Sequence, residues 1–209
     1  MQNNDPTRAD APMPKARKLV SLAAIAMVAF AVFPAVSAAA ACPNADTQPA
    51  QISPLDYQAS VLCLLNDERA ANGLVALTSQ AQLMQAAAGH SGDMLRLSYF
   101  SHTDPDGTTF SQRITDTGYL RGAKRWVVGE NLAWGTAAIG TPRALVDGWM
   151  ESPPHRENVL EPRFRDVGIG AVSGRPDYPS ASNAMILTAD FGLARGKAAR
   201  SRLRRTPGK

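Results

Sequence analysis

An apolar run from Leu19 to Val36 divides this chain more sharply than any other feature of its sequence. Three basic residues closely precede the run, and the small residues 37–41 follow it. Basic, apolar and small residues in this order are typical of a secretory signal peptide, here residues 1–41. Because the run is also about as long as a short membrane span, an uncleaved anchor through residues 19–36 stays as the alternative.

The remainder is long enough for one globular domain. Of the 209 residues, 44% are hydrophobic and 19% are charged, a composition that supports a single substantial core. We predict a linker over 42–52, a domain over 53–193 and a tail over 194–209, and we assume a monomer. Signal peptide and anchor both place this part of the chain outside the cytoplasm, as a secreted or extracytoplasmic protein.

Charge is distributed very unevenly along the chain. Residues 42–194 hold 11 Lys and Arg against 16 Asp and Glu, whereas the last fifteen residues carry seven positive charges and no acid. An acidic folded part argues against nucleic acid as a partner. The tail has no apolar face, so we expect it to be disordered and able to contact an anionic envelope.

Only two cysteines are present, Cys42 and Cys63, and both lie beyond the expected cleavage point. In an oxidising compartment such a pair indicates one disulfide, which would attach the start of the mature chain to the first helix. The alternative is a lipoprotein acylated at Cys42, since three alanines precede that residue.

Helix signals are strong in the first half of the domain. Ser53 is placed to cap a helix that has Pro54 at its first position and ends near Gly73. A second helix is expected to be capped by Ser79. Its apolar stripe has a 3.6-residue period and consists of Leu83, Ala86, Ala87, His90, Met94 and Leu97.

The second half alternates short helices with extended segments. We expect a helix over 110–117, an extended segment over 126–134, and a helix that begins at 141–142 and is stopped by Ser152-Pro153-Pro154. Strands over 167–172 and 184–191 close the domain, and the tryptophans are interpreted as core residues (Trp126, Trp134 and Trp149). This order predicts an α+β fold, a three-layer α/β/α sandwich around a small antiparallel sheet.

The chain has three histidines, and an acid stands between the last two. His90 lies on the apolar helical face, which favours a core histidine bonded to backbone over a ligand. His102 and His155 lie in loops or at element ends, where functional side chains are usually presented. Glu130, within Gly-Glu-Asn, either lines the same cleft or satisfies buried backbone donors, and Asn131 favours a structural bridge to the backbone.

Several longer motifs occur in a specific order: HSGDMLRLSYFSHTDPDG, then GEN with LAWG, then GWMESPPHRENVLEPRFRDVGIGAV, and finally LTADFG. Their order and spacing resemble the bacterial branch of the CAP family, which comprises cysteine-rich secretory proteins, antigen 5 and pathogenesis-related 1 proteins. The resemblance spans about Leu55 to Gly192. It implies the CAP fold and a cavity formed by two His and two Glu.

By position in those motifs, the resemblance places His102, Glu130 and His155 in the cavity. The fourth member departs from the family pattern, because Ser152 stands where the second Glu is expected. Two imidazoles and one carboxylate are able to bind a divalent metal such as zinc. A neutral Ser152 should make that binding weaker and more dependent on pH.

Three kinds of function remain open. The first is a non-catalytic extracellular binding module whose cleft takes a small ligand, a lipid, a cell-wall fragment or a divalent metal. The second is a metal-assisted hydrolase of peptide or cell-wall polymer, and the third is an envelope-associated domain that binds a protein. Absence of the fourth acid favours the first and third, and no nucleophile elbow supports a Ser/His/Glu triad of Ser101 or Ser152 with His155 and Glu130.

Overall fold

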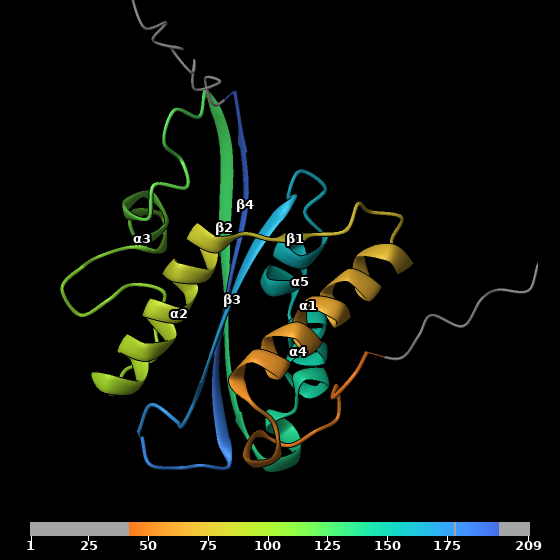
Figure 1. The fold of residues 1–209 in the computed structure, drawn as a ribbon, viewed down its shortest axis with the longest axis vertical. Helices are drawn as coiled ribbons and strands as arrows, with labels where there is room; N and C mark the ends of the chain where they lie inside the picture. Colours follow the sequence, from red (N-terminus) through yellow and green to blue (C-terminus); the bar gives the residue numbers. More distant parts are fainter. Residues whose placement is uncertain (1–41, 178, 197–209) are drawn as a thin grey trace, which may run out of the picture. The chain divides into compact units, whose positions relative to one another are not determined.

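The computed structural model describes residues 42–177 and 179–196, so the predictions for 1–41 and for the tail from 197 onwards lie outside the described residues. A four-stranded sheet in the order β1-β3-β4-β2 forms the centre (Figure 1). Its strands are β1 (Thr78–Ser79), β2 (Arg125–Thr136), β3 (Asp166–Ser173) and β4 (Ala184–Arg195). The helices are α1 (Pro54–Ala71), α2 (Ala81–Arg96), α3 (Phe110–Asp116), α4 (Pro142–Glu151) and α5 (Pro153–Leu160), with 3-10 turns η1 (Pro49–Gln51) and η2 (Ala137–Gly140). Within the described part of the chain, no helix has the length and apolar character needed to cross a membrane.

The predicted three-layer sandwich is confirmed, with α1, α4 and α5 on one face of the sheet and α2 and α3 on the other (Figure 1). β4 pairs antiparallel with both β2 and β3. The short β1 pairs parallel with β3, so the sheet is mixed rather than purely antiparallel as expected. The difference arises because β1 is a two-residue part of the connection between α1 and α2, and this part runs alongside the start of β3.

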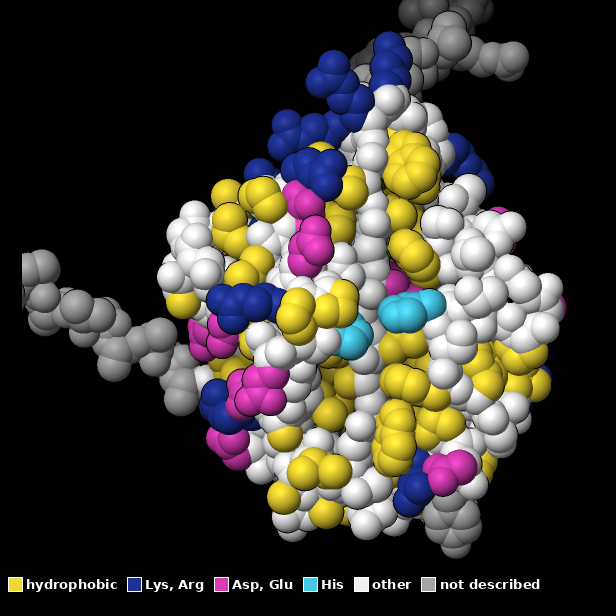
Figure 2. Space-filling view, turned by 180° about the vertical axis from the view of Figure 1, so that it is seen from behind, with side chains coloured by type: hydrophobic (Ala, Val, Ile, Leu, Met, Phe, Trp, Pro, Cys, Tyr) yellow, Lys and Arg dark blue, Asp and Glu magenta, His cyan; other side chains and the backbone are white. Residues whose placement is uncertain are grey.

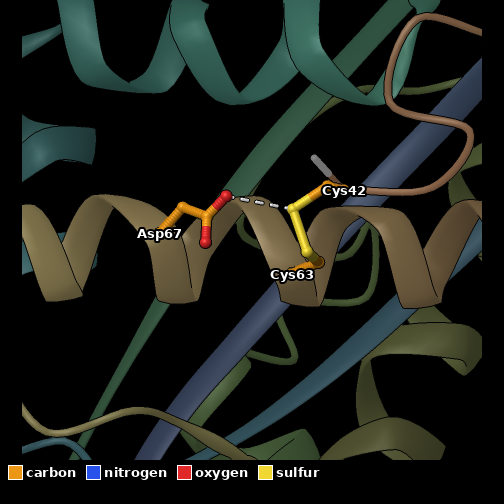
Figure 3. A group of neighbouring side chains, drawn as sticks. All are labelled: Cys42, Cys63 and Asp67. Atoms are coloured by element: carbon orange, nitrogen blue, oxygen red, sulfur yellow. Dashed lines mark hydrogen bonds between the residues drawn. A yellow bond between two sulfur atoms is a disulfide. The ribbon is translucent and has the colours of Figure 1, made fainter. Parts of the chain in front are cut away.

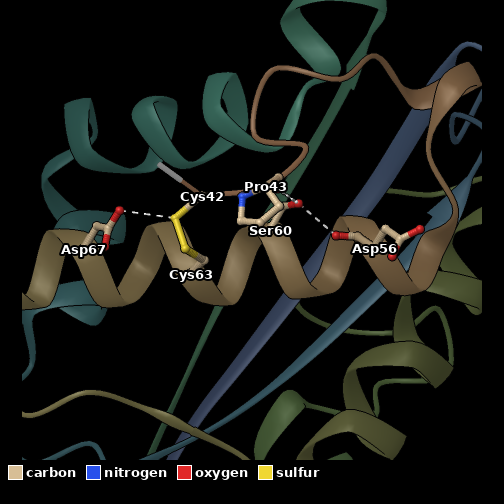
Figure 4. Close-up of a disulfide and its surroundings, with 6 residues drawn as sticks. All are labelled: Cys42, Pro43, Asp56, Ser60, Cys63 and Asp67. Atoms are coloured by element: carbon tan, nitrogen blue, oxygen red, sulfur yellow. Dashed lines mark hydrogen bonds between the residues drawn. A yellow bond between two sulfur atoms is a disulfide. The ribbon is translucent and has the colours of Figure 1, made fainter. Parts of the chain in front are cut away.

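The disulfide predicted between Cys42 and Cys63 is present, with a Cα–Cα distance of 5.7 Å (Figure 4). It attaches the first described residue to the middle of α1. Because the Cys42 sulfur is bonded to Cys63, it is not available for acylation. Beside the disulfide, the Ser60 hydroxyl donates a hydrogen bond to the Pro43 carbonyl oxygen, with 2.6 Å between the two oxygen atoms. Cys42 and Ala45 are buried. The segment 42–52, which the sequence predicts as a linker, therefore packs against the domain.

Helix α1 begins as its sequence predicts, since the Ser53 hydroxyl accepts from the Asp56 amide at 3.1 Å. The prediction that Ser79 caps α2 is wrong. Ser79 belongs to β1, and the Gln80 side chain accepts from the amides of the first turn instead. Leu97, expected on the buried stripe of α2, lies just past the helix end and is 45% exposed.

Helix α2 packs unusually close to the sheet because glycines lie beneath it. A Cβ atom at Gly168 would lie 2.0 Å from the carbonyl carbon of Leu83, and one at Gly170 would lie 2.3 Å from that of Ala87. No side chain fits between these backbones. The close approach places the polar residues of α2 directly over β3 and β4.

The prolines that stop α4 also start another helix, which the sequence analysis did not anticipate. α4 ends at Glu151 as expected, and Pro153 and Pro154 occupy the first positions of α5. Proline is favoured there because its missing N–H would have no partner in a first helical turn. His155 therefore lies in the first turn of α5 rather than in a loop.

Two of the three tryptophan predictions are wrong. Trp149 is 2% exposed and belongs to the core, but Trp126 is 54% exposed and Trp134 is 38% exposed. Both lie on β2, the edge strand, which has a neighbour on one side only. β4 also continues past the predicted domain end at 193, to Arg195.

Candidate functional site

Glu130, at the centre of β2, accepts hydrogen bonds from two basic side chains of the α2–α3 region. The His102 Nδ1 atom lies 2.7 Å from its Oε1 atom, and the Arg113 guanidinium donates to its Oε2 atom at 2.7 Å. The Glu130 side chain is fully buried, whereas the His102 ring is 51% exposed. The imidazole thus faces solvent while the acid behind it fixes its orientation.

A second acid, Asp104, fixes the connection between α2 and α3 that carries His102. Its Oδ1 atom accepts from Arg113 at 2.9 Å and from the Tyr99 hydroxyl at 2.8 Å. His90 is fully buried beside them, and its Nε2 atom lies 3.0 Å from the Ser101 carbonyl oxygen, so the predicted backbone bond is present. Burial lowers the pKa of His90, although the neighbouring Glu130 opposes that effect.

Asp190 lies directly across from Glu130 in the β2–β4 pairing and is fully buried. Within the described part of the chain, neither oxygen of its carboxylate has a hydrogen-bond donor. Burial raises the pKa of Asp190 well above its usual range, and the negative charge of Glu130 raises it further. The neutral acid is the form that fits, because its O–H is able to donate to Glu130 whereas two carboxylates would repel each other.

His155 is held from the opposite side of β2. Its Nδ1 atom lies 2.9 Å from the Ser152 hydroxyl, and its backbone carbonyl accepts from the Asn131 amide at 3.0 Å. Asn131 is thus the side-chain bridge to backbone that the sequence predicts. Burial lowers the pKa of His155, and the charge of His102 lowers it further.

Gly129 of the Gly-Glu-Asn motif allows α5 to approach β2. A Cβ atom at this position would lie 2.8 Å from the Asn158 Oδ1 atom and 3.0 Å from the Phe164 ring. Asn158 also donates to the Glu130 carbonyl oxygen at 3.1 Å. The motif therefore positions both the acid and the helix that carries His155.

A groove of about 350 Å³ opens beside the outer edge of β2. Figure 2 shows histidine side chains midway along this side of the domain, with hydrophobic side chains above and below them. The Trp149 indole donates to the Leu132 carbonyl oxygen at 2.9 Å, which fixes one wall. The groove is lined by Phe100, Leu132, Ala133, Trp134, Leu145, Gly148, Trp149, Ser152 and His155.

The predicted site residues are thus brought together in two pairs, His102 with Glu130 and His155 with Ser152. Glu130 contacts His102 and not His155 among its described hydrogen-bond partners, so the Ser152, His155 and Glu130 arrangement is not a catalytic triad. Ser101 belongs to the loop turn, where its hydroxyl accepts from the Thr103 amide.

In the described residues, one group alone offers three potential ligand atoms within 4.8 Å of one another, and it consists of Cys42, Cys63 and Asp67 (Figure 3). It does not fit a metal, because both sulfurs are bonded to each other and are not thiolates. The Asp67 Oδ2 atom lies 3.2 Å from the Cys42 sulfur. A metal shared by His102 and His155 stays a prediction.

Three residues that hold the site together are not among those predicted from the sequence: Arg113, Asp104 and Asp190. Asp104 lies in the segment Asp104-Pro105-Asp106-Gly107, whose composition is typical of a turn, and Arg113 lies on a short helix with no motif of its own. Asp190 does have one usable signal, since an acid within an otherwise apolar strand (AMILTADFG) is rarely buried without a partner.

The family profile of "CAP: Cysteine-rich secretory protein family" matches residues 62–189. The chain is 35% identical over 117 residues to "Uncharacterized protein YkwD" of Bacillus subtilis (strain 168), an alignment covering 56% of this chain and 42% of that protein. It is 31% identical over 110 residues to "Uncharacterized membrane protein YlbC" of the same organism, covering 53% of this chain and 30% of that protein. The chain thus spans less than half the length of either relative.

Solved structures show the same fold. An outer surface protein from Borrelia burgdorferi has a TM-score of 0.58 at 21% identity, covering 69% of this chain and 97% of that chain. An extracellular protein containing an SCP domain from Bacillus anthracis has a TM-score of 0.50 at 26% identity, covering 67% of this chain and 43% of that chain.

Proposed function

Because this chain belongs to the CAP family of cysteine-rich secretory proteins, we propose that it is an extracytoplasmic binding module without catalytic turnover. The observation that carries the proposal is the groove beside the outer edge of β2. It takes a small ligand that has an apolar body and one polar group. The apolar body would lie along the aromatic walls, and the polar group would face His155.

The groove has the size and chemistry of a small-ligand site. Its volume of about 350 Å³ lies within the usual range for such pockets. Most of its lining is apolar, and the polar side chains of Ser152 and His155 stand together at one place. Leu132 and Trp149 are almost fully buried and joined by a hydrogen bond, so these walls exist before a ligand arrives.

Catalysis is disfavoured by the state of Glu130. A general base has to reach solvent or substrate, but this side chain is fully buried and its two oxygens already accept from His102 and Arg113. Among the described residues, the His155 ring contacts the Ser152 hydroxyl and no carboxylate, so the acid that would stabilise a charged imidazole during proton transfer is missing.

A divalent metal is the second candidate ligand, and one observation favours it. Histidines that bind metals usually donate their other ring nitrogen to a carboxylate, as the His102 Nδ1 atom does to Glu130. Glu130 would then orient a ligand rather than serve as one. The Nε2 atoms of His102 and His155 would hold the ion, which would supply a positive charge able to attract an anionic ligand group.

An extracytoplasmic location is supported by three observations. The apolar segment over residues 19–36 has the order of an export signal or an anchor. The disulfide between Cys42 and Cys63 needs an oxidising compartment. Similar proteins carry the names outer surface protein, extracellular protein and membrane protein.

Filling the groove tests the binding function. A Cβ atom at Gly148 would meet no heavy atom within 4 Å, so Gly148→Leu puts a side chain into the groove without disturbing α4. With the apolar dye N-phenyl-1-naphthylamine as probe, this variant should bind at least about tenfold more weakly than the parent protein. Gly89→Leu is the matched control, because Gly89 is exposed on α2 and equally open. Equal dye affinity in both variants would refute the groove as the binding site.

Zinc titration by calorimetry tests the second candidate. With only two imidazole ligands, binding should be weak and should weaken further as the pH falls and protons compete for the nitrogens. Ser152→Glu should tighten zinc binding by about tenfold, since it supplies the missing charged oxygen ligand, and His102→Ala should abolish it. Zinc binding that survives His102→Ala would assign the metal elsewhere.

A further inference from the structure

Positive charge is concentrated where β2 begins and β4 ends. Lys124 and Arg125 enter β2, and Arg195 closes β4. Arg125 lies directly across from Arg195 in the strand pairing, and the Lys124 amide donates to the Arg195 carbonyl oxygen at 3.0 Å. These three residues and Trp126 are exposed, and we refer to the four as the basic end.

The charges of the basic end are not balanced inside the domain. None of the ion pairs between described residues includes Lys124, Arg125 or Arg195. Like charges directly across a strand pair destabilise a sheet, so Arg125 and Arg195 cost stability where they stand. The rest of the domain is acidic, because residues 42–194 without Lys124 and Arg125 hold nine Lys and Arg against 16 Asp and Glu. A cationic patch on an acidic domain indicates an anionic partner outside it.

Trp126 adds an apolar element to this end of the sheet, on the strand face opposite that of Arg125 and Arg195 because side chains alternate along β2. Its side chain lies opposite Ala194 and is 54% exposed. The other partly exposed tryptophan, Trp134, already has a cationic partner, because the Arg175 guanidinium lies over its ring at 5.1 Å from the ring centre. Exposed indole beside arginine and lysine is the combination that proteins place at the boundary between lipid headgroups and acyl chains.

The sequence beyond the basic end continues the same charge. After Arg195 it contains six more basic residues and no acid (Lys197, Arg200, Arg202, Arg204, Arg205 and Lys209). Figure 2 shows Lys and Arg side chains gathered at one end of the domain. The described residues thus form the folded edge of a longer basic segment.

We propose that the basic end docks the domain onto an anionic lipid bilayer, with Trp126 at the headgroup boundary and the three cations on the phosphates. A soluble polyanion would use the cations but not the exposed indole, whereas a bilayer uses both. Leu132 lies six residues along β2 from Trp126, which puts the groove about 20 Å from the lipid surface. The groove therefore stays open while the domain is docked.

Vesicle flotation tests the docking. The full chain, purified in the form that a secreting host releases, is mixed with phosphatidylglycerol vesicles or with phosphatidylcholine vesicles. The neutral vesicles give the baseline for any binding through the N-terminal apolar segment. Each charge near an anionic surface contributes roughly fivefold to binding, so Lys124→Gln/Arg125→Gln/Arg195→Gln should lower partitioning to phosphatidylglycerol on the order of a hundredfold at low salt.

The control variant removes the same charge elsewhere. Arg96, Arg143 and Arg163 are exposed and paired with surface acids, so Arg96→Gln/Arg143→Gln/Arg163→Gln changes net charge equally. It should retain most of the partitioning. If both triple variants lose binding alike, net charge alone attracts the protein and the basic end is not the docking surface.

Tryptophan fluorescence separates a bilayer from a soluble polyanion. Phosphatidylglycerol vesicles should shift the emission to the blue, and Trp126→Phe should abolish that shift while Trp134→Phe retains it. Soluble polyglutamate should give no such shift. If polyglutamate binds as tightly as the vesicles and no blue shift depends on Trp126, the partner is an anionic polymer and the bilayer assignment is overturned.

Discussion

The two faces of the central sheet differ in chemistry although the same strands form both. On the face towards α1, α4 and α5, the first eight residues of β4 present only apolar side chains (Met185, Leu187, Ala189 and Phe191). On the face towards α2, the intervening residues Thr188 and Asp190 are polar and fully buried. The first face holds the fold together, and the second holds the titratable groups that support His102.

This division shows how a small domain accommodates a polar site. The apolar face carries the large continuous core, which also includes the disulfide and the docked segment 42–52. The other face has two smaller apolar clusters, separated by the polar groups around Glu130. Buried polar groups contribute little to stability, so the apolar face has to supply most of it.

The largest expected effect is therefore on the apolar face. Phe191 is fully buried and stacks on Phe164 with 5.5 Å between ring centres. Phe191→Ala should lower the free energy of unfolding by about 3 to 5 kcal/mol, measured by urea denaturation. Thr188→Val on the opposite face should cost only about 1 kcal/mol, since it removes one hydrogen bond and keeps the shape. Equal losses would refute the division of labour between the faces.

Removing the disulfide should have the next largest effect. The bond closes a loop with a sequence separation of 21 residues, so Cys42→Ser/Cys63→Ser should lower the free energy of unfolding by about 3 kcal/mol. Ser60→Ala, which removes the neighbouring anchor of the same segment, should cost about 1 kcal/mol. Peptide mapping without reductant that finds both thiols free in the exported protein would contradict the bond itself.

On the polar face, one substitution of a buried residue should raise the free energy of unfolding instead of lowering it. The folded-state pKa of Asp190 is raised above its ordinary value of 3.8, so the folded protein keeps a proton that the unfolded chain releases. Stability due to Asp190 is therefore greatest at or below pH 3.8 and falls as the pH rises towards the folded-state pKa. Asp190→Asn removes this loss and should stabilise the protein by about 2 kcal/mol near pH 8.

Denaturation at several pH values measures this difference. The gain from Asp190→Asn should shrink towards zero only well below pH 3.8, where the parent side chain is neutral in both the folded and the unfolded state. Burial lowers the pKa of His90 and His155, so both proteins lose stability as the pH falls below the ordinary histidine range, and that loss cancels in the comparison. Asp93→Asn, at an exposed ion pair, should show no such trend. A variant that is less stable at every pH would mean that Asp190 has a donor.

The helices could be predicted from sequence more completely than the polar groups that lie between α2 and the sheet. Ser53 caps α1 because capping depends on residues three apart, and the stripe of α2 follows from helical period alone. The choice of Gln80 over Ser79 could not be foreseen, because β1 pairs with β3 across nearly ninety positions of the chain.

The sequence names the four residues of the two histidine pairs, but not Arg113, Asp104 and Asp190, which surround Glu130 and His102. The motifs pointed to His102, Glu130 and His155, and the Glu130–Asp190 pair depends on a strand register that joins positions sixty residues apart. The exposure of Trp126 and Trp134 depends on β2 being an edge strand, a property of strand order rather than of local pattern. Long-range pairing is the information that a single sequence lacks.

The smallest expected effect concerns the end of β4, where the predicted domain boundary at 193 and the strand end at Arg195 disagree. Ala194 packs against the small apolar cluster beside α3 and lies opposite Trp126, so deletion of everything after Leu193 removes two paired residues from β4. That truncation should cost about 1 kcal/mol in thermal or urea unfolding, because it loses backbone hydrogen bonds and a little apolar burial. Deletion of everything after Gly196 leaves β4 intact and should change stability by less than about 0.5 kcal/mol. Two equal values near zero would place the boundary at 193, whereas a large loss from the shorter deletion would show that residues beyond 196 pack against the polar face.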